Sequence, residues 1–158
     1  MVATAHLLVA GAIASRVQNP ALAVSLSFVS HFIMDAVPHW DIGTDWRKRT
    51  KLTTGATAIL DTLIGAILSF AFFRSSAPSV PLLLACMAAS VLPDWLETPW
   101  YIFFADPRRT KPKKNAGVGE RIAYRMYKLS NAFHRKTSFI FGTATQIATV
   151  LFFLLLLS

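Results

Sequence analysis

Long apolar runs alternate with short polar segments along the chain, and each run has a length typical of a helix. The runs cover residues 3 to 17, 20 to 37, 52 to 73, 81 to 104 and 137 to 157. A helix of about 20 apolar residues crosses the hydrocarbon core of a bilayer. We therefore predict an all-α fold, a polytopic integral membrane bundle of about four to five helices within a single domain.

Prolines and polar residues mark the expected ends of these helices. At ~1.5 Å per residue the first run spans only about 20 Å, so it is expected to be a thin span, a tilted span or a re-entrant helix. Asn19 and Pro20 are typical of a helix start, with Asn19 as the N-cap. Pro38 disfavours helical geometry at Val37 and predicts the end of the second helix there. Pro93 predicts a kink in the fourth run.

The segment from 106 to 136 is basic, and its centre has the pattern of an amphipathic helix near 118 to 134. Apolar residues recur there at three- and four-residue steps with cationic residues between them: Ile122, Met126, Leu129 and Phe133, and Arg121, Arg125 and Lys128. A helix with this pattern lies in the membrane–water interface. We expect this segment on the membrane surface.

Composition supports the membrane assignment. Hydrophobic residues make up 54% of the chain, and the mean hydropathy is +0.47. The excess of 16 Lys and Arg over 8 Asp and Glu suits nucleic acid or anionic lipid, and the apolar runs favour lipid. We expect membrane lipids and no nucleic acid as partners. No Lys or Arg precedes the first run, which argues against a cleaved signal peptide.

The basic residues predict an orientation. If the long runs cross in turn, fourteen of the 16 lie on one side and only Arg16 and Arg74 lie on the other. The positive-inside rule makes the first side cytoplasmic. We therefore expect four crossing helices, after or including the first run, in the inner (plasma) membrane, with the C-terminus outside. The fourteen are Arg47, Lys48, Arg49, Lys51, Arg108, Arg109, Lys111, Lys113, Lys114, Arg121, Arg125, Lys128, Arg135 and Lys136.

Residues 30 to 41 contain two histidines and two acids whose spacing suits a metal ion. His31 and Asp35 are one i,i+4 step apart, so both side chains leave the same helix face. An imidazole nitrogen and a carboxylate at that spacing can bind one metal ion together. His39 and Asp41 follow on the turn beyond the helix. The alternative is a polar cap that ends a membrane helix at the interface.

Other ionisable residues of the apolar runs are expected at the same depth. The cytoplasmic half would contain His6, His31, Asp35, Asp61, Asp94, Glu97 and His134. An acid inside the membrane costs roughly 2.5 to 3.5 kcal/mol on insertion scales unless it pairs or binds an ion. The layer therefore favours a shared cation or a proton relay. Asp94 and Glu97 follow a proline and could instead bond to freed backbone groups.

Four short blocks carry a family resemblance. They are residues 4 to 8 (TAHLL), 30 to 35 (SHFIMD), 92 to 94 (LPD) and 134 to 138 (HRKTS). Together they resemble the inner-membrane-associated metal-dependent hydrolases (the YdjM-like, LexA-binding group), and their motif style is similar to that of zinc-dependent phospholipase C. The chain departs from the family pattern at Leu96, Glu97 and Ser138. The resemblance implies a membrane-associated hydrolase.

We expect a membrane-embedded metal-dependent hydrolase that acts at the cytoplasmic interface, with a lipid phosphoester as substrate. The predicted metal ligands are His6, His31, Asp35, His39, Asp94 and His134. Mixed His and carboxylate ligands suit a divalent ion, Zn²⁺ first and Mn²⁺ or Fe²⁺ as alternatives. Such an ion would lower the pKa of a bound water and supply hydroxide at neutral pH.

Further residues are predicted to assist this chemistry. Asp61 and Glu97 are candidates for the general base or for carboxylates that support the metal ligands. Arg135 and Lys136, with the basic segment 108 to 114, are candidates for binding a substrate phosphate. The alternative for these cations is that they set the orientation and contact anionic headgroups.

Two other classes of function stay open. One is a small metal-binding or cation-conducting membrane protein, which as a transporter would need to form a homo-oligomer. The other is a scaffold whose polar layer is structural. The two metal-binding classes of function require the candidate ligands to converge, and the scaffold does not. For a metal site, at least four of five side chains should lie within roughly 5 Å of a common point. The five are His6, His31, Asp35, Asp94 and His134.

Overall fold

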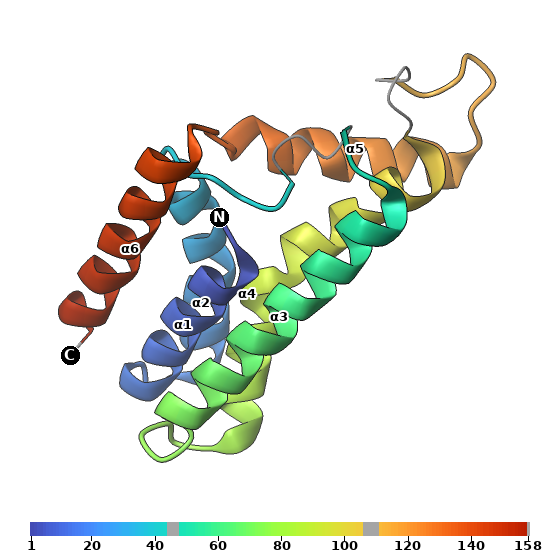
Figure 1. Ribbon diagram of the computed structural model, residues 1–158. Coiled ribbons are helices and arrows are strands. Elements are labelled where there is room, and N and C mark those ends of the chain that lie inside the picture. Colours follow the sequence, from blue (N-terminus) through green and yellow to red (C-terminus); the bar gives the residue numbers. More distant parts are fainter. Residues whose placement is uncertain (44–47, 106–110, 158) are drawn as a thin grey trace.

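The computed structural model describes residues 1–43, 48–105 and 111–157, and within these ranges it is all-helical (Figure 1). The elements are α1 (Ala3–Arg16), α2 (Pro20–Asp35), α3 (Lys51–Phe73), α4 (Val80–Pro99), the π-helical turn η2 (Trp100–Phe104), α5 (Val118–Phe133) and α6 (Phe139–Leu156). The predicted all-α class is confirmed. Each predicted apolar run forms a helix.

The first apolar run forms the central helix of the bundle. α1 contacts α2, α3, α4 and α6, and most of its residues are buried. Its many alanines let neighbouring helices approach closely, as small side chains do in membrane bundles. At Gly11 a Cβ atom would lie only 2.4 Å from the Ser69 Oγ of α3. The first run is therefore a core element, which its short length alone did not indicate.

Three helices in the described part of the chain are long and apolar enough to cross a membrane. They are α3, the continuous segment of α4 and η2, and α6. α1 has 14 residues and α2 has 16, both fewer than the about 20 that a crossing needs. By length and composition, three described helices could cross a membrane, where four were expected. α2 ends at Asp35, earlier than expected, because Val37 N turns back to bond Met34 O at 3.0 Å.

Prolines shape the second half of the α4 segment. Pro93 and Pro99 both lie inside α4, and a proline leaves a helical carbonyl without its donor. After Pro99 the chain widens into η2. The ring of Trp100 there lies 4.8 Å from that of Tyr124 and 5.9 Å from that of Tyr127. These aromatic contacts join the end of α4 to α5.

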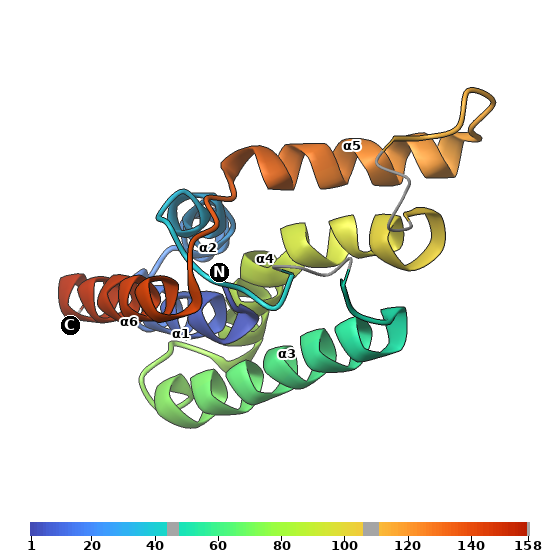
Figure 2. The same ribbon diagram turned by 45° about the horizontal axis from the view of Figure 1, so that its top comes forward.

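The predicted amphipathic helix is confirmed as α5, which lies across one end of the bundle (Figures 1 and 2). Its buried residues, Ala123 and Ser130, lie on the side that packs against α4, η2 and α2. Two residues of the predicted apolar stripe, Ile122 and Leu129, are each 52% exposed. Much of that stripe is therefore available to contact lipid.

The basic segments and the C-terminal end of α6 lie at opposite ends of the bundle (Figure 1). The connections that carry Arg16 and Arg74 lie at the same end as the C-terminus. α5 and the start of α3 lie at the other end. Of the fourteen basic residues assigned to one side, Arg47, Arg108 and Arg109 lie outside the described residues.

Candidate metal centre

Segments far apart in the sequence bring all four histidines of the chain together with three aspartates. They are His6 from α1, His31 and Asp35 from α2, His39 and Asp41 from the loop after α2, Asp94 from α4, and His134 from the loop before α6. We call this set the His/Asp cluster. The side chain of Asp94 is 28% exposed, and those of the other members are buried. All six predicted metal ligands belong to the cluster.

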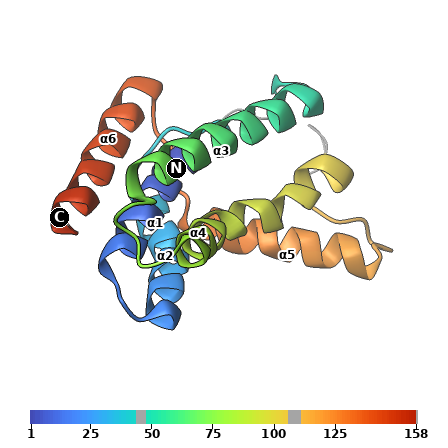
Figure 3. The same cartoon turned by 90° about the horizontal axis from the view of Figure 1, so that it is seen from below.

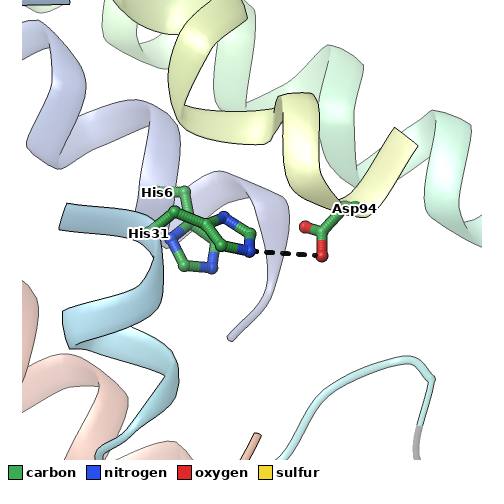
Figure 4. Close-up of side chains that lie close together, drawn as sticks. All are labelled: His6, His31 and Asp94. Carbon is green, nitrogen blue, oxygen red and sulfur yellow. Dashed lines mark ion pairs between the residues drawn. The ribbon is translucent and has the colours of Figure 1, made fainter. Parts of the chain in front are cut away.

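One half of the cluster is the triad of His6, His31 and Asp94 (Figure 4). One ligand atom from each lies within 4.8 Å of the other two. The two imidazole rings stack, with centroids 4.2 Å apart. Asp94 reaches toward them from α4, and its Oδ1 lies 3.7 Å from His31 Nε2.

The other half is the triad of Asp35, His39 and His134, whose ligand atoms also lie within 4.8 Å of one another. Backbone hydrogen bonds between two loops hold it. His39 N donates to Arg135 O at 2.8 Å, and Thr137 N donates to His39 O at 2.9 Å. This short bridge brings together residues nearly a hundred positions apart, and no sequence pattern marked it.

Asp35 belongs to the second triad and also contacts both histidines of the first. Its Oδ1 lies 3.3 Å from His6 Nε2 and 3.7 Å from His39 Nε2. Its Oδ2 lies 3.3 Å from His31 Nε2 and 3.1 Å from His134 Nε2. Each oxygen therefore faces one histidine of each triad. The Oδ1 atom also accepts from the N-terminal ammonium of Met1.

Backbone carbonyls determine which ring nitrogen of His31 and of His39 faces the cluster. His31 Nδ1 lies 2.7 Å from Ser90 O, and His39 Nδ1 lies 2.8 Å from Val37 O. Because a carbonyl oxygen only accepts, each Nδ1 carries the hydrogen, and Nε2 of the neutral ring then bears a lone pair. These Nε2 atoms face carboxylate oxygens, which also only accept when ionised. A cation between them, either a proton on each ring or a metal ion, removes this repulsion.

The spacing inside the cluster fits the ligands of a tetrahedral metal ion. Two ligand atoms about 2.0 to 2.1 Å from Zn²⁺ lie about 3.3 to 3.4 Å apart in that geometry, whereas charge-assisted hydrogen bonds are about 2.7 to 2.9 Å long. The shortest pairs are His134–Asp35 at 3.1 Å, His6–Asp35 and His31–Asp35 at 3.3 Å, and His134–Asp41 at 3.4 Å. Among the described residues, the buried Nε2 atoms of His6, His31 and His39 have no hydrogen-bond partner. The cluster could therefore hold a metal ion.

Asp41 joins the second triad, although it was not among the predicted ligands. Its Oδ2 lies 3.5 Å from His39 Nε2 and 3.4 Å from His134 Nε2. Burial raises the pKa of Asp41, but the contacts with His134, His39 and Lys136 outweigh burial and hold the pKa below its usual range. The side chain is thus an anion at neutral pH. Its position two residues after His39 was the signal that could have identified it.

Asp61, a predicted base, bonds to the start of α1. Its Oδ2 accepts from Ala3 N at 2.6 Å, and its Oδ1 accepts from Thr4 Oγ1 at 2.7 Å and from Thr4 N at 3.2 Å. Just before these residues, the nitrogen of Met1 donates to Asp35. These contacts fix the start of the helix that carries His6, so the structure gives Asp61 a positioning role.

Glu97, the other predicted base, lies one turn after Asp94 on α4. It is 8% exposed and lines the same cavity as Asp94 and His134. Its Oε2 has no hydrogen-bond partner among the described residues. A buried carboxylate oxygen of this kind, beside the cluster, is placed to exchange a proton with a bound molecule.

The two predicted phosphate-binding residues differ in their surroundings. Lys136 lines the cavity beside the cluster, and its Nζ lies 3.7 Å from Asp41 Oδ1. Arg135 contributes its backbone to the bridge between the loops, and its side chain is exposed. Residues 108 to 110 of the predicted basic segment lie outside the described residues.

No family model matches the chain, and no curated protein or solved structure matches it. The function of the protein therefore has to be inferred from the geometry and chemistry of the His/Asp cluster and its surroundings.

Proposed function

We propose that the protein is a membrane-embedded metal-dependent hydrolase that cleaves a lipid phosphoester at the cytoplasmic interface. One observation carries this proposal. Four histidines and three aspartates are gathered at ligand-to-ligand distances, and the lone pairs of His31 and His39 face carboxylates. The N-terminal ammonium of Met1 pairs with Asp35 and Lys136 lies near Asp41, and a bound metal ion would offset the remaining cost of gathering three aspartates inside a membrane. The resemblance of four sequence blocks to the inner-membrane-associated metal-dependent hydrolases supports the same class.

The residues of the two triads would hold one divalent ion or two. His6, His31 and Asp94 would hold one ion, and His39, His134 and Asp41 the other. This donor set favours Zn²⁺, with Mn²⁺ or Fe²⁺ as alternatives. A divalent ion there would supply Lewis acidity and activate water near neutral pH.

Three further residues would have different roles beside a bound ion. Glu97 would exchange a proton with the water or the substrate, because it lies on the cavity wall one turn from Asp94. Asp61 keeps α1, and with it His6, in place. Lys136 attracts the anionic phosphate group.

The proposed location is the inner (plasma) membrane, with the cluster near the cytoplasmic side. The excess of basic residues at the α5 end of the bundle supports this orientation through the positive-inside rule. The exposed apolar stripe of α5 would then rest on the cytoplasmic leaflet.

Elemental analysis of the purified protein tests the metal site. We expect one or two equivalents of a divalent metal in the wild type and loss of at least one in His31→Ala and Asp35→Asn. Ile33→Ala is the matched control, since Ile33 lies on the same helix and is 54% exposed. A wild-type protein that contains no metal after purification in chelator-free buffer, and takes up none on addition, would contradict the proposal.

Phosphate release separates hydrolysis from metal binding alone. Phospholipid vesicles that contain the protein should release water-soluble phosphate, and a chelator or Glu97→Gln should reduce the rate at least about tenfold, since proton transfer alone commonly contributes 10² or more. If metal is bound but no phosphate is released, the protein is a metal-binding or cation-conducting membrane protein. If neither is found, the polar layer is structural.

A further inference from the structure

A cavity lies between α3 and α4 beside the His/Asp cluster. It encloses about 170 Å³, and Asp41, Asp94 and His134 form part of its wall. Figures 2 and 3 show α3 and α4 as neighbouring helices joined by one turn. We call this space the α3–α4 cavity. It gives a bound molecule direct access to the cluster.

Small side chains on one face of α3 form one wall of the cavity. Thr54, Gly55, Ala58 and Thr62 line it, at the three- and four-residue steps that place side chains on one helix face. A Cβ atom at Gly55 would meet nothing within 4 Å. The described chain therefore leaves the space in front of this wall unfilled.

The opposite wall reaches the outer surface of the bundle. Trp95 and Ile102, from α4 and η2, line the cavity and are 39% and 41% exposed. α3 also exposes apolar side chains, Leu52 and Ile59 among them. In a bilayer these side chains contact acyl chains, so the cavity opens toward lipid as well as toward the interface.

In the described part of the chain, three Lys or Arg side chains line the same cavity. Lys51 Nζ donates to Ile102 O at 2.8 Å, and Arg49 Nη1 donates to Ile42 O at 3.0 Å. Because a carbonyl oxygen carries no net charge, both cations keep their attraction for an anion. Lys136 is the third, and its Nζ also lies 3.7 Å from the Asp41 carboxylate. The carboxylates of Asp41, Asp61, Asp94 and Glu97 also line the cavity. Asp61 bonds to the start of α1, and the other three lie at or beside the His/Asp cluster, where a divalent ion would offset their charge. A cavity that opens to lipid, with Arg49 and Lys51 away from that cluster, matches a molecule with an anionic head and an apolar tail.

We propose that the α3–α4 cavity binds a phospholipid of the surrounding membrane. Its phosphate lies near Arg49, Lys51 and Lys136, and the first part of an acyl chain passes Ala58 and leaves beside Trp95. The lipid enters sideways and does not leave the bilayer. The inference rests on the proposed function for one point, that the phosphoester lies beside the His/Asp cluster.

Binding can be measured without hydrolysis. The probe is a dihexanoyl phosphonate analogue of phosphatidic acid, in which CH₂ replaces the ester oxygen, titrated calorimetrically into the full chain in detergent. We expect Ala58→Leu, which fills the cavity, to weaken binding at least about tenfold. Ala56→Leu makes the same change on an exposed position of α3 and should leave the affinity within about twofold.

Two further ligands test which part of the lipid is recognised. Glycerol 3-phosphate lacks acyl chains, and dihexanoylglycerol lacks phosphate, so each should bind at least about tenfold more weakly than the analogue. Lys51→Gln should weaken binding of the analogue and not that of dihexanoylglycerol. Equal affinity for glycerol 3-phosphate would overturn the proposal, because the cavity would then bind phosphate alone. An unchanged affinity in Ala58→Leu would overturn it as well.

The metal content of every variant is measured in parallel. Ala58→Leu should keep the wild-type metal content, which shows that its bundle is folded. Binding of the analogue by a protein that contains no metal or releases no phosphate would refute the proposed hydrolase and support the lipid site. Metal-dependent phosphate release would support the proposed hydrolase. If Ala58→Leu then had no effect on binding of the analogue, the lipid site in the cavity would be refuted.

Discussion

At the scale of single residues, the cluster depends on which ring nitrogen each histidine presents. His31 and His39 both use Nδ1 to donate to a backbone carbonyl, so both direct Nε2 toward Asp35. The acceptor for His31 is Ser90 O, in the turn of α4 that Pro93 interrupts. Pro93 removes the helical donor of the preceding carbonyl, Ala89 O, and Ser90 O accepts from His31 beside this break. The backbone of α4 thus orients a candidate ligand on another helix.

Gly142 is the residue that lets α6 approach the loop carrying His39. A Cβ atom there would lie 2.2 Å from Trp40 N and 2.7 Å from the carbonyl carbon of His39. We expect Gly142→Ala to push this loop away, to lower the free energy of unfolding by about 1 to 3 kcal/mol and to weaken metal binding. Thermal unfolding in detergent and elemental analysis measure the two effects.

Gly119→Ala is the control for this prediction. Gly119 lies in α5, and a Cβ atom there would meet nothing within 4 Å. Its replacement should leave metal binding unchanged and raise helix stability by up to about 1 kcal/mol. Unfolding and metal content equal to wild type in Gly142→Ala would show that the loop does not depend on this contact.

At the scale of elements, α3 holds α1 in the register that places His6 in the cluster. Asp61 bonds to the first residues of α1, and Ser69 Oγ donates to Leu7 O at 2.7 Å. Between these contacts, a Cβ atom at Gly65 would lie 2.6 Å from Thr4 Cα. A helix held at several points along its length cannot slide, so the depth of His6 is fixed by α3.

Removal of the Asp61 carboxylate should loosen the start of α1. We expect Asp61→Ala to lower the free energy of unfolding by about 1 to 3 kcal/mol, because buried amide groups lose a charged acceptor. Metal affinity should fall as well, through the displacement of His6. Isothermal titration with Zn²⁺ gives the affinity, and Thr57→Ala is the control, since its hydroxyl bonds only to carbonyls of its own helix. A variant with normal metal affinity would show that His6 is held without Asp61.

At the scale of the whole molecule, the bundle is polar at one end and apolar around its sides. α3 and α6 expose large apolar side chains, such as Ile67 at 68% and Leu155 at 74%. The basic segments gather at the end that α5 covers, and the C-terminal end of α6 lies at the other (Figure 1). This distribution suits a protein that crosses a bilayer, and the positive-inside rule predicts that its basic end lies in the cytoplasm.

Cysteine labelling tests the orientation. A membrane-impermeant maleimide added to intact cells should label Ser76→Cys, in the α3–α4 turn, and should label Lys114→Cys only after lysis. Both positions are exposed, whereas the native Cys86 is buried and gives little background. Labelling of Lys114→Cys in intact cells would reverse the orientation, and with it the proposed cytoplasmic site.

The positions of the helices and most of the candidate ligands were predictable from the sequence. Asn19 accepts from Leu22 N at 3.0 Å, as its role of N-cap required. The amphipathic pattern of α5 and the i,i+4 pair of His31 and Asp35 were also correct. Each of these depends on residues less than about two helical turns apart, where backbone geometry relates spacing to direction.

Only the tertiary structure decided which distant segments meet. The bridge between His39 and the backbone of Arg135, the use of Asp61 at the start of α1, and the place of Asp41 in the cluster come from contacts between separate elements. The burial of short α1 at the centre of the bundle is of the same kind. Such contacts arise from the packing of whole helices and loops, in which a single residue such as Gly142 decides how closely two segments approach. A local pattern shows which face of a helix is polar, and packing determines what that face contacts.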